Sequence, residues 1–261
     1  MLEPVLNTFL ALENLVMRVN PPGGRDDLTI LDGFSLSVQE GEVVALFGPN
    51  GCGKSTLLHV IAGLQHVTSG VVAFTDPEKR DSLGFAFQQF ADSLFPWDNV
   101  LDNIGLKYHI QGLSKQVARE KARNFADELG FSLPWNSYPY QLSGGQKQLT
   151  ALLRTLVYRP DFCLLDEPLS ALDYQTSLEV LLKISALWDD QGTTSLLISH
   201  DIDQAIFLAD RVVVLTNLPM RPKKILNIPF PRPRALDLIQ SEEFFRLRSV
   251  ALAAFVEEVE G

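Results

Sequence analysis

The chain has 261 residues, enough to bury one substantial core, and carries 22 Lys and Arg against 32 Asp and Glu, a formal net charge of -10. This acidic balance argues against a protein that coats nucleic acid. No uninterrupted apolar stretch approaches the roughly 18 residues needed to span a bilayer, and the N-terminal segment has Glu3 where a secretory signal is positively charged. We therefore expect a cytosolic chain that touches membranes only through a partner.

The first predicted element is a hairpin. Two segments of alternating polarity, 10–19 and 28–38, flank PPGGRDD at 21–27, which is rich in turn residues. Their spacing predicts an antiparallel pair of strands. A short apolar strand at 43–47 follows, and a glycine-rich loop then leads into a helical pattern over 54–64.

Strands and helices alternate along most of the remaining chain. Three apolar runs have the length and composition of strands buried on both faces, at 162–165, 195–198 and 211–215. Helical patterns cover 146–158 and 174–188. This alternation predicts an α/β fold with a mostly parallel sheet and helices on its faces.

Two segments depart from the alternation and are predicted to be helical. The stretch 98–140 has no buried-strand pattern, but Ser114 is a candidate N-cap and Gly130 a candidate helix stop. We expect a helical insertion in the α/β core there. A charged helix over 241–258 is predicted as the last element.

A phosphate-binding loop is predicted between the strand at 43–47 and the next helix. Glycines in GPNGCGKS let the backbone curl so that successive N–H groups and the helix N-terminus point at phosphate oxygens. Lys54 is expected to reach the β- and γ-phosphates, and the Ser55 hydroxyl to bind magnesium. The residues assigned to ATP are Gly48, Pro49, Asn50, Gly51, Cys52, Gly53, Lys54, Ser55 and Thr56.

Two carboxylates end the apolar run FCLLDEP at 162–168. Acids beside so apolar a strand are costly unless cations or hydrogen bonds satisfy them. Asp166 is therefore a candidate magnesium ligand. Glu167 is then positioned to orient or deprotonate an attacking water.

His200 follows a third predicted core strand. Strand C-termini in such sheets converge on the ligand, so this histidine is a candidate for the same site. Asp201 and Gln204 resemble a capping pair for the next helix. The other histidines have no comparable context, namely His59, His66 and His109.

The segment LSGGQ at 142–146 distinguishes this chain from other nucleotide enzymes. Ser143 and Gln146 fit a capping box across two glycines, which leaves an unobstructed helix N-terminus. Adjacent glycines weaken a first turn by roughly 1 kcal/mol each relative to alanine, a cost that is easier to understand if another molecule must approach closely.

With this motif the chain resembles the ABC ATPase family, whose signature is LSGGQ. The resemblance covers nearly the whole chain and includes, in the family's order, GPNGCGKS, GFAFQ, LSGGQ, FCLLDEP, SALD and His200. It implies bound ATP and Mg2+, with Gln88 touching the magnesium and the lytic water beside the catalytic Glu167 and His200. Asp173 would communicate across a dimer.

A site divided between two subunits follows from the same resemblance. The signature residues would complete the ATP site of the opposite ATPase subunit, which is identical or homologous. These residues are Ser143, Gly144, Gly145 and Gln146, the first three of which would donate to the γ-phosphate.

The resemblance also implies a domain organisation. A single nucleotide-binding domain would span 1–261, with a RecA-like P-loop core and an antiparallel β-subdomain in approximately 1–97 and 159–235. A helical subdomain would occupy about 98–158, and a helical tail 236–261.

Two positions depart from the family pattern. Val19 stands where an aromatic ring normally stacks on adenine, so base stacking is either lost or supplied elsewhere. Leu149 follows the signature where a basic residue is usual. Neither change removes a catalytic group, but both leave room for a partner that is not identical.

The segment SLFPWDNVLDNI at 93–104 resembles that of importer ATPases for nitrate, sulfonate, taurine and bicarbonate-type anions, and 206–219 and 229–234 support this subgroup. The resemblance implies an ATPase on the inner face of the cell membrane that energises uptake of a small anion through a separate permease, with a solute-binding protein as an indirect partner. An aromatic cluster here could receive a permease helix or pack the insertion onto the core. It comprises Phe95, Pro96 and Trp97.

Two other classes remain as alternatives. A soluble ABC ATPase of DNA repair or translation usually carries long coiled coils or two ATPase units, and neither is present. For a metabolic P-loop kinase, LSGGQ would be accidental. No nucleic-acid partner is expected.

Overall fold

The computed structural model of the chain describes residues 7–20 and 27–260. The turn predicted at 21–27 lies outside the described residues except for its last position. The first part of the described chain forms a three-stranded antiparallel sheet in the order β2-β1-β4. Its strands are β1 (Thr8–Val19), β2 (Leu28–Gln39) and β4 (Ser69–Phe74).

The predicted hairpin is confirmed, because β1 and β2 pair antiparallel from Thr8 opposite Gln39 to Val19 opposite Leu28. Strand β4 also pairs antiparallel with β1 and was not predicted. All of its residues are partly or fully exposed, and the short apolar run 71–74 that it contains was not interpreted as a strand.

A second sheet of six strands runs in the order β5-β6-β7-β3-β8-β9. All of its neighbouring pairs are parallel except β8 with β9, which is antiparallel. Its strands are β3 (Val43–Phe47), β5 (Leu83–Ala86), β6 (Phe162–Asp166), β7 (Thr194–Ile198), β8 (Arg211–Leu215) and β9 (Pro222–Asn227). The predicted α/β fold with a mostly parallel sheet is confirmed.

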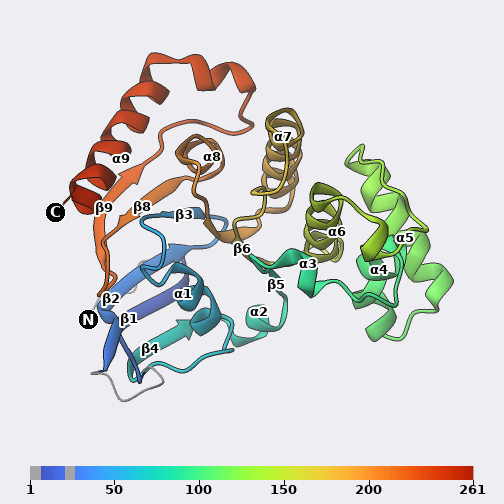
Figure 1. Ribbon diagram of the computed structural model, residues 1–261, viewed down its shortest axis with the longest axis horizontal. Coiled ribbons are helices and arrows are strands. Elements are labelled where there is room, and N and C mark those ends of the chain that lie inside the picture. The colour runs from blue at the N-terminus through green and yellow to red at the C-terminus, as the bar shows by residue number, and fades with distance from the viewer. Residues whose placement is uncertain (1–6, 21–26, 261) are drawn as a thin grey trace.

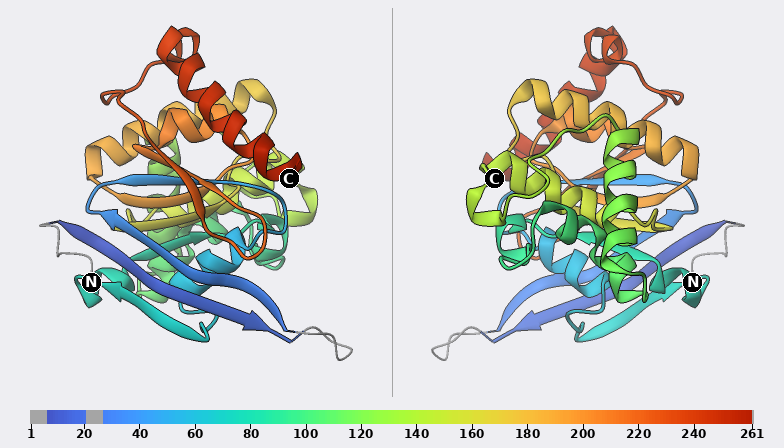
Figure 2. Two further views of the ribbon diagram at one scale, coloured as in Figure 1. Left: turned by 90° about the vertical axis from the view of Figure 1, so that its left-hand side faces the viewer. Right: turned by 90° about the vertical axis from the view of Figure 1, so that its right-hand side faces the viewer.

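Helices cover the faces of the parallel sheet and build a lobe beside it (Figure 1). The antiparallel sheet forms the opposite layer, below the parallel sheet in Figure 2, whereas α9 lies above it. The helices are α1 (Lys54–Ile61), α2 (Pro77–Asp81), α3 (Phe90–Ser93), α4 (Val100–Ile110), α5 (Lys115–Glu128), α6 (Gly144–Leu156), α7 (Tyr174–Gln191), α8 (Ile202–Leu208) and α9 (Glu242–Glu260), with short 3-10 turns at Pro139–Gln141 and Leu236–Gln240.

Two apolar cores lie on opposite faces of the parallel sheet. Successive residues of β3 alternate between them, since Ala45 and Phe47 belong to one cluster and Val44 and Leu46 to the other. Every residue of β3 is buried. A strand covered on both faces must be apolar throughout, which explains why such strands were visible in the sequence.

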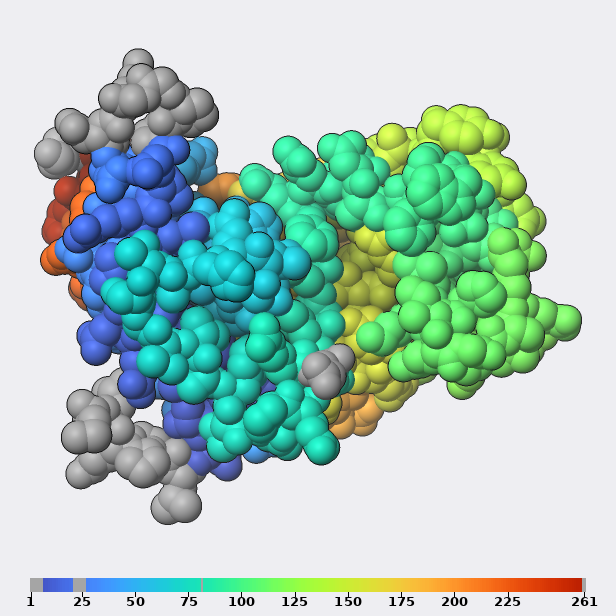
Figure 3. Space-filling view, turned by 90° about the horizontal axis from the view of Figure 1, so that it is seen from below, coloured from blue at the N-terminus to red at the C-terminus, as the bar shows by residue number. Residues whose placement is uncertain are grey.

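The predicted helical insertion is present as a lobe built mainly from α4, α5 and α6 (Figure 1). Ser114 caps α5 by accepting a hydrogen bond from the Val117 backbone N–H, and Gly130 just past the helix has a positive φ of 64°, as predicted. The green surface of α4 and α5 is set off from the blue and cyan surface of the core, with a yellow surface visible between them (Figure 3).

Asp102 joins α4 to α5 by ion pairs. Arg119 donates two hydrogen bonds of 2.7 Å to its carboxylate, and the Lys115 ammonium lies 3.1 Å away. Burial alone would favour the neutral acid, but the hydrogen bonds from both cations outweigh it and lower the pKa of Asp102.

A buried arginine connects the end of the parallel sheet to the segment before α9. The Arg234 guanidinium, whose side chain is 0% exposed, donates to the carbonyls of Phe207 (2.7 Å) and Ala209 (2.9 Å) at the C-terminus of α8. It also pairs with Asp210. Burial lowers the pKa of Arg234 to about 10.

Replacing Arg234 by Ala removes the donor to the carbonyls of Phe207 and Ala209, and to two further carbonyls at longer distance, together with one charge partner of Asp210. We expect the free energy of unfolding to fall by about 3 kcal/mol. Urea unfolding followed by circular dichroism measures this. The control Arg246→Ala removes an exposed arginine on α9 and should leave stability nearly unchanged. Equal losses of stability from Arg234→Ala and Arg246→Ala would contradict the role of Arg234 in joining the end of α8 to the segment before α9.

Candidate functional site

The glycine-rich loop lies between β3 and α1 and is packed tightly. A Cβ at Gly48 would lie 2.9 Å from the Leu215 Cβ, and one at Gly53 would lie 2.6 Å from a methyl carbon of Ile30. Gly53 also has φ 108°, a conformation that side chains rarely adopt. Larger residues at these two positions would push the loop away from the sheet.

Lys54 is buried at the start of α1, and its ammonium lies within the curl of the loop. Its Nζ donates to the carbonyls of Gly48 (2.8 Å) and Pro49 (2.7 Å). Burial lowers the pKa of Lys54, partly offset by the nearby Glu167 and Asp166. The loop therefore presents a positive charge in a largely desolvated position.

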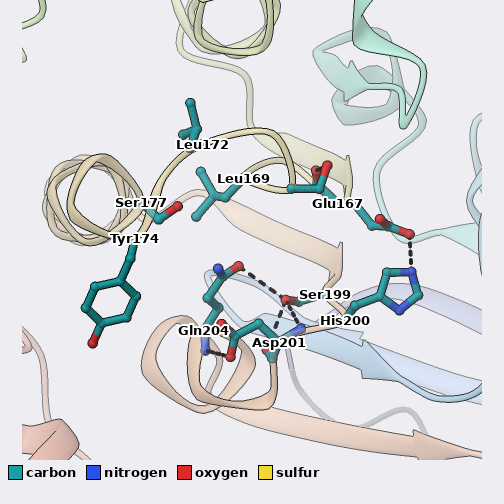
Figure 4. A pocket seen from close by; sticks show the side chains of 10 residues that line it. Glu167, Leu169, Leu172, Tyr174, Ser177, Ser199, His200, Asp201 and Gln204 are labelled. Carbon is teal, nitrogen blue, oxygen red and sulfur yellow. Dashed lines mark hydrogen bonds and ion pairs between the residues drawn. The ribbon is translucent and has the colours of Figure 1, made fainter. Parts of the chain in front are cut away.

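Three residues of the predicted site follow neighbouring strands of the parallel sheet, and the side chains of two of them contact a carboxylate oxygen of the third. Gln88 follows β5, Glu167 follows β6 and His200 follows β7. The Gln88 Nε2 donates to the Glu167 Oε1 at 2.9 Å. The His200 Nε2 contacts the same oxygen (Figure 4). The sheet thus brings together side chains that are far apart in the chain.

The backbone of Glu167 is in the left-handed region, with φ 52°. This conformation is uncommon for a residue other than glycine and costs free energy. Contacts around the residue hold it there, because its N–H donates to the Ile198 carbonyl (3.0 Å) and its carbonyl accepts from the Gln148 Nε2 (3.0 Å). The strained turn aims the carboxylate at Gln88 and His200.

Asp166 is only 2% exposed, and its Oδ1 has no hydrogen-bond partner among the described residues. Burial raises the pKa of Asp166, although a hydrogen bond from Ser55 acts in the opposite direction. A buried carboxylate oxygen without a partner, next to a hydroxyl, suits a hard divalent cation such as Mg2+. The described residues, those of this site included, contain no group of three or more His, Cys, Asp or Glu that could hold a metal by itself.

A cavity of about 200 Å3 lies over the glycine loop. Asn50, Lys54, Ser55 and Thr56 line its polar side together with Glu167 and His200. Its other side is apolar and is formed by Leu28, Ile30 and Leu218. A larger hollow of about 420 Å3 begins at Glu167 and His200 and extends past Tyr174 (Figure 4).

The signature residues lie apart from this cavity. Ser143 and Gln146 form the predicted capping box at the start of α6, with backbone-to-side-chain distances of 3.0 and 3.3 Å. A Cβ at Gly144 would meet open space, whereas one at Gly145 would crowd Leu172 and the Ala171 carbonyl. Internal packing therefore accounts for the absence of a side chain at Gly145, whereas a side chain at Gly144 would meet no other part of this chain.

Other predicted positions are found as follows. Asp173 caps α7 by accepting from the Thr176 N–H (3.0 Å) and hydroxyl (2.7 Å), which lowers the pKa of Asp173.

Asp201 caps α8 as predicted, but Gln204 does not complete a capping box, because its Oε1 accepts from the Ser199 hydroxyl instead. Leu149 is buried at 7% exposure within the apolar core.

The aromatic cluster lies at the entry to the helical lobe. The rings of Phe95 and Trp97 stack with centroids 5.1 Å apart, and Trp97 is 70% exposed. Asn103 of α4 fixes the backbone of Phe95 by two hydrogen bonds. The hydrogen bonds fix the backbone that carries the ring pair, and the Trp97 ring is its exposed member.

Sequence reasoning missed two contributors to the site. Gln148 is 2% exposed and joins α6 to the segment after β6, donating to the Glu167 carbonyl and accepting from the Ala171 N–H (2.7 Å). Leu218 lines the apolar side of the cavity, which Val19 does not. Neither belongs to a motif with a recognisable pattern.

Comparison with known proteins agrees with this geometry. A family model described as "ABC transporter" matches residues 31–170. An aliphatic sulfonates import ATP-binding protein of Agrobacterium fabrum is 40% identical over 227 residues, covering 87% of this chain and 78% of that protein. A bicarbonate transport ATP-binding protein of Synechococcus elongatus is 37% identical over 258 residues, covering 96% and 91%.

Among solved structures, a dimeric ATP-binding cassette in a post-hydrolysis state bound to ADP and Pi is 28% identical. The match has a TM-score of 0.75 and covers 85% of this chain and 100% of that one. The fold and site define a P-loop nucleotide hydrolase. The chain belongs to the ABC transporter family and is an ABC ATPase.

Burial of Asp166 costs stability in the nucleotide-free protein, so we expect Asp166→Asn to raise the free energy of unfolding by about 1 kcal/mol at pH 7. The pKa of Asp166 is higher in the folded state than in the unfolded state. At pH values between these two pKa values, the folded state therefore binds more protons. Stability of the unsubstituted protein therefore falls as pH rises through this window.

Urea unfolding at pH 4 and pH 7 compares the two proteins. The gain from Asp166→Asn should shrink towards pH 4, because the raised pKa lets the folded carboxyl take up a proton as the pH falls. A variant that is less stable than the parent at both values would contradict the assigned cost.

Proposed function

We propose that this chain is the ATP-hydrolysing subunit of an ABC importer, which energises uptake of a small anion through a separate membrane permease. The convergence of Gln88 and His200 on Glu167 beside the phosphate loop carries the hydrolytic part of the proposal. The names of the sulfonate and bicarbonate relatives support the importer and anion parts. Nitrate and taurine remain members of the same solute class.

ATP binding in this proposal exploits the buried charge of Lys54. Its ammonium exchanges the Gly48 and Pro49 carbonyls for oxygens of the β- and γ-phosphates, a stronger charge-assisted contact. Ser55, Asp166 and Gln88 are the residues that would hold Mg2+. When bound, the cation would supply positive charge to offset the charge on the phosphates.

Hydrolysis requires a water positioned in line with the γ-phosphate. Glu167 orients this water and accepts its proton. His200 and Gln88 fix the carboxylate from two sides, so little reorganisation is needed at the moment of reaction. The products are ADP and inorganic phosphate.

A second ATPase subunit completes the site. Ser143, Gly144 and Gly145 donate from the N-terminus of α6 to the γ-phosphate bound by the opposite chain, and Asp173 links the two sites across the interface. Gln146 supports this turn through its capping contact. The buried position of Leu149 removes one reason for expecting a different partner, so we take the second subunit as an identical copy.

The chain would lie on the inner face of the cell membrane, bound to the permease, and serve a solute-binding protein indirectly. Among the described residues, no helix is long and apolar enough to cross a bilayer. We also propose the domain division expected above, with the segment from 98 to 158 moving as a helical subdomain against the core. Closure driven by ATP would push the permease between its conformations.

The first functional test is Glu167→Gln, which removes the base but keeps the size of the side chain. We expect ATP turnover to slow about a thousandfold while nucleotide binding is retained. Phosphate release and equilibrium binding measure the two properties. The control Glu179→Gln on the exposed face of α7 should hydrolyse ATP normally. Near-normal turnover by Glu167→Gln would refute the role of this residue.

The second test concerns the permease contact. Trp97→Ala removes the exposed half of the ring pair and should weaken recovery of a multi-span permease from detergent extracts by about tenfold or more. ATPase activity of the isolated chain should be unchanged. Phe245→Ala, on the exposed surface of α9, is the matched aromatic control. Loss of recovery with both variants, or with neither, would argue against docking at Trp97.

The same extracts distinguish the alternative functions. A soluble ABC ATPase of repair or translation would recover DNA or ribosomes in place of a permease. A metabolic kinase would leave phosphate on a small metabolite instead of releasing it to water. No feature of the described residues favours either class.

A further inference from the structure

The loop between β8 and β9, residues 216–221, forms part of the nucleotide cavity. Leu218 is 38% exposed and lines the apolar side of the cavity with Leu28 and Ile30. Beside it, the Met220 N–H donates to the Ile30 carbonyl at 2.8 Å, and the Met220 side chain packs 3.9 Å from where a Cβ on Gly53 would lie. The loop therefore touches both β2 and the phosphate loop.

The exposed part of this loop is hydrogen-bonded to α9, which runs beside β8 and β9 (Figure 1). The Glu258 Oε1 accepts from the Asn217 N–H at 2.8 Å, and the Glu258 carbonyl accepts from the Asn217 Nδ2 at 2.9 Å. Lys223 of β9 donates to the other carboxylate oxygen at 3.1 Å. One residue of α9 thus makes two hydrogen bonds to the immediate neighbour of Leu218.

The same end of α9 is also fixed to the strand that leads into the phosphate loop. The Phe255 ring lies 5.0 Å from that of Phe47, the residue immediately before Gly48. Glu258 is one helical turn beyond Phe255. The position of Glu258 is therefore fixed relative to the phosphate loop. Through its hydrogen bonds to Asn217, Glu258 in turn fixes the position of Leu218.

The apolar side of the cavity is a candidate contact surface for the base of the nucleotide, because Val19 of β1 has no aromatic ring that could stack on it. A purine presents a flat, weakly polar face, and an aliphatic side chain at fixed distance binds it through dispersion and burial. We propose that Glu258 is a positioning residue for nucleotide binding, which holds Asn217 so that Leu218 packs against the base. The inference rests on the proposed function, since it assumes that ATP occupies this cavity.

A contact to the base predicts a particular ligand dependence. Tripolyphosphate carries the triphosphate of ATP without ribose or base, so its binding with Mg2+ depends on the phosphate loop alone. Moving Leu218 should weaken ATP binding and leave tripolyphosphate binding unaffected. General damage to the fold would weaken both ligands together.

The test is isothermal titration of Mg-ATP and Mg-tripolyphosphate into the full chain and three variants. Glu258→Ala should raise the Kd for Mg-ATP about fivefold, and leave that for Mg-tripolyphosphate within about twofold. Glu258→Gln keeps an oxygen that accepts from the Asn217 N–H, and should bind ATP like the parent protein. Glu257→Ala is the matched control, because that neighbouring side chain is 71% exposed and lies 3.8 Å from Lys223.

Combination with Leu218→Ala tests whether the effect passes through Leu218. If Glu258 acts by placing Leu218, the double variant should lose much less than the product of the two single losses. Independent, multiplying losses would overturn the proposal. So would equal weakening of ATP and tripolyphosphate by Glu258→Ala, or an unchanged Kd for ATP.

Failure of the proposed function gives a different result. If the parent protein bound tripolyphosphate and ATP with equal affinity, the base would make no contact in this cavity and the positioning role would be refuted while ATP hydrolysis stood. If the parent protein bound neither ligand, the proposed function itself would be refuted.

Discussion

The arrangement depends on one carboxylate oxygen, the Glu167 Oε1, at which Gln88 and His200 meet. Parallel pairing of β5, β6 and β7 brings their C-terminal ends to the same edge, and the left-handed backbone of Glu167 turns its side chain towards the other two. Gln148 holds the carbonyl of the same residue from α6. Any change in strand order or in this turn would separate groups that come from three distant parts of the chain.

Charge burial is the cost of this arrangement. Asp166 and Lys54 are nearly inaccessible, burial raises the pKa of the acid and lowers that of the base, and one oxygen of Asp166 has no partner among the described residues. Such a site is destabilising until a ligand with complementary charge arrives. In the proposed function, Mg-ATP supplies that charge. Its binding therefore offsets the cost of burying these groups and raises the free energy of unfolding.

Sequence patterns predicted what is locally encoded. Strand β3 is apolar throughout, and β6, β7 and β8 each contain an apolar run, because both faces of these strands are covered. The capping residues Ser114 and Ser143 act within their own turns. Strand β9 was missed because it is largely exposed and half polar. Strand β4 is also exposed, and its apolar run, 71–74, is only four residues long and was not interpreted as a strand. The contacts of Gln148, Leu218 and Glu258 were also beyond prediction, because each joins segments whose proximity is set by the tertiary fold. For Gly145, packing against Leu172 within the chain replaces part of the ligand-based explanation.

The central claim is that a second copy of the chain completes the ATP site, because the signature residues lie outside the cavity that holds Lys54 and Glu167. Mixing two inactive variants tests it most directly. Ser143→Arg blocks the signature and Lys54→Ala disables the phosphate loop. Each alone should fail to hydrolyse ATP, whereas their mixture should recover activity, since the intact loop of one chain meets the intact signature of the other. Hydrolysis at the parental rate by Ser143→Arg alone, with no gain on mixing, would contradict the account.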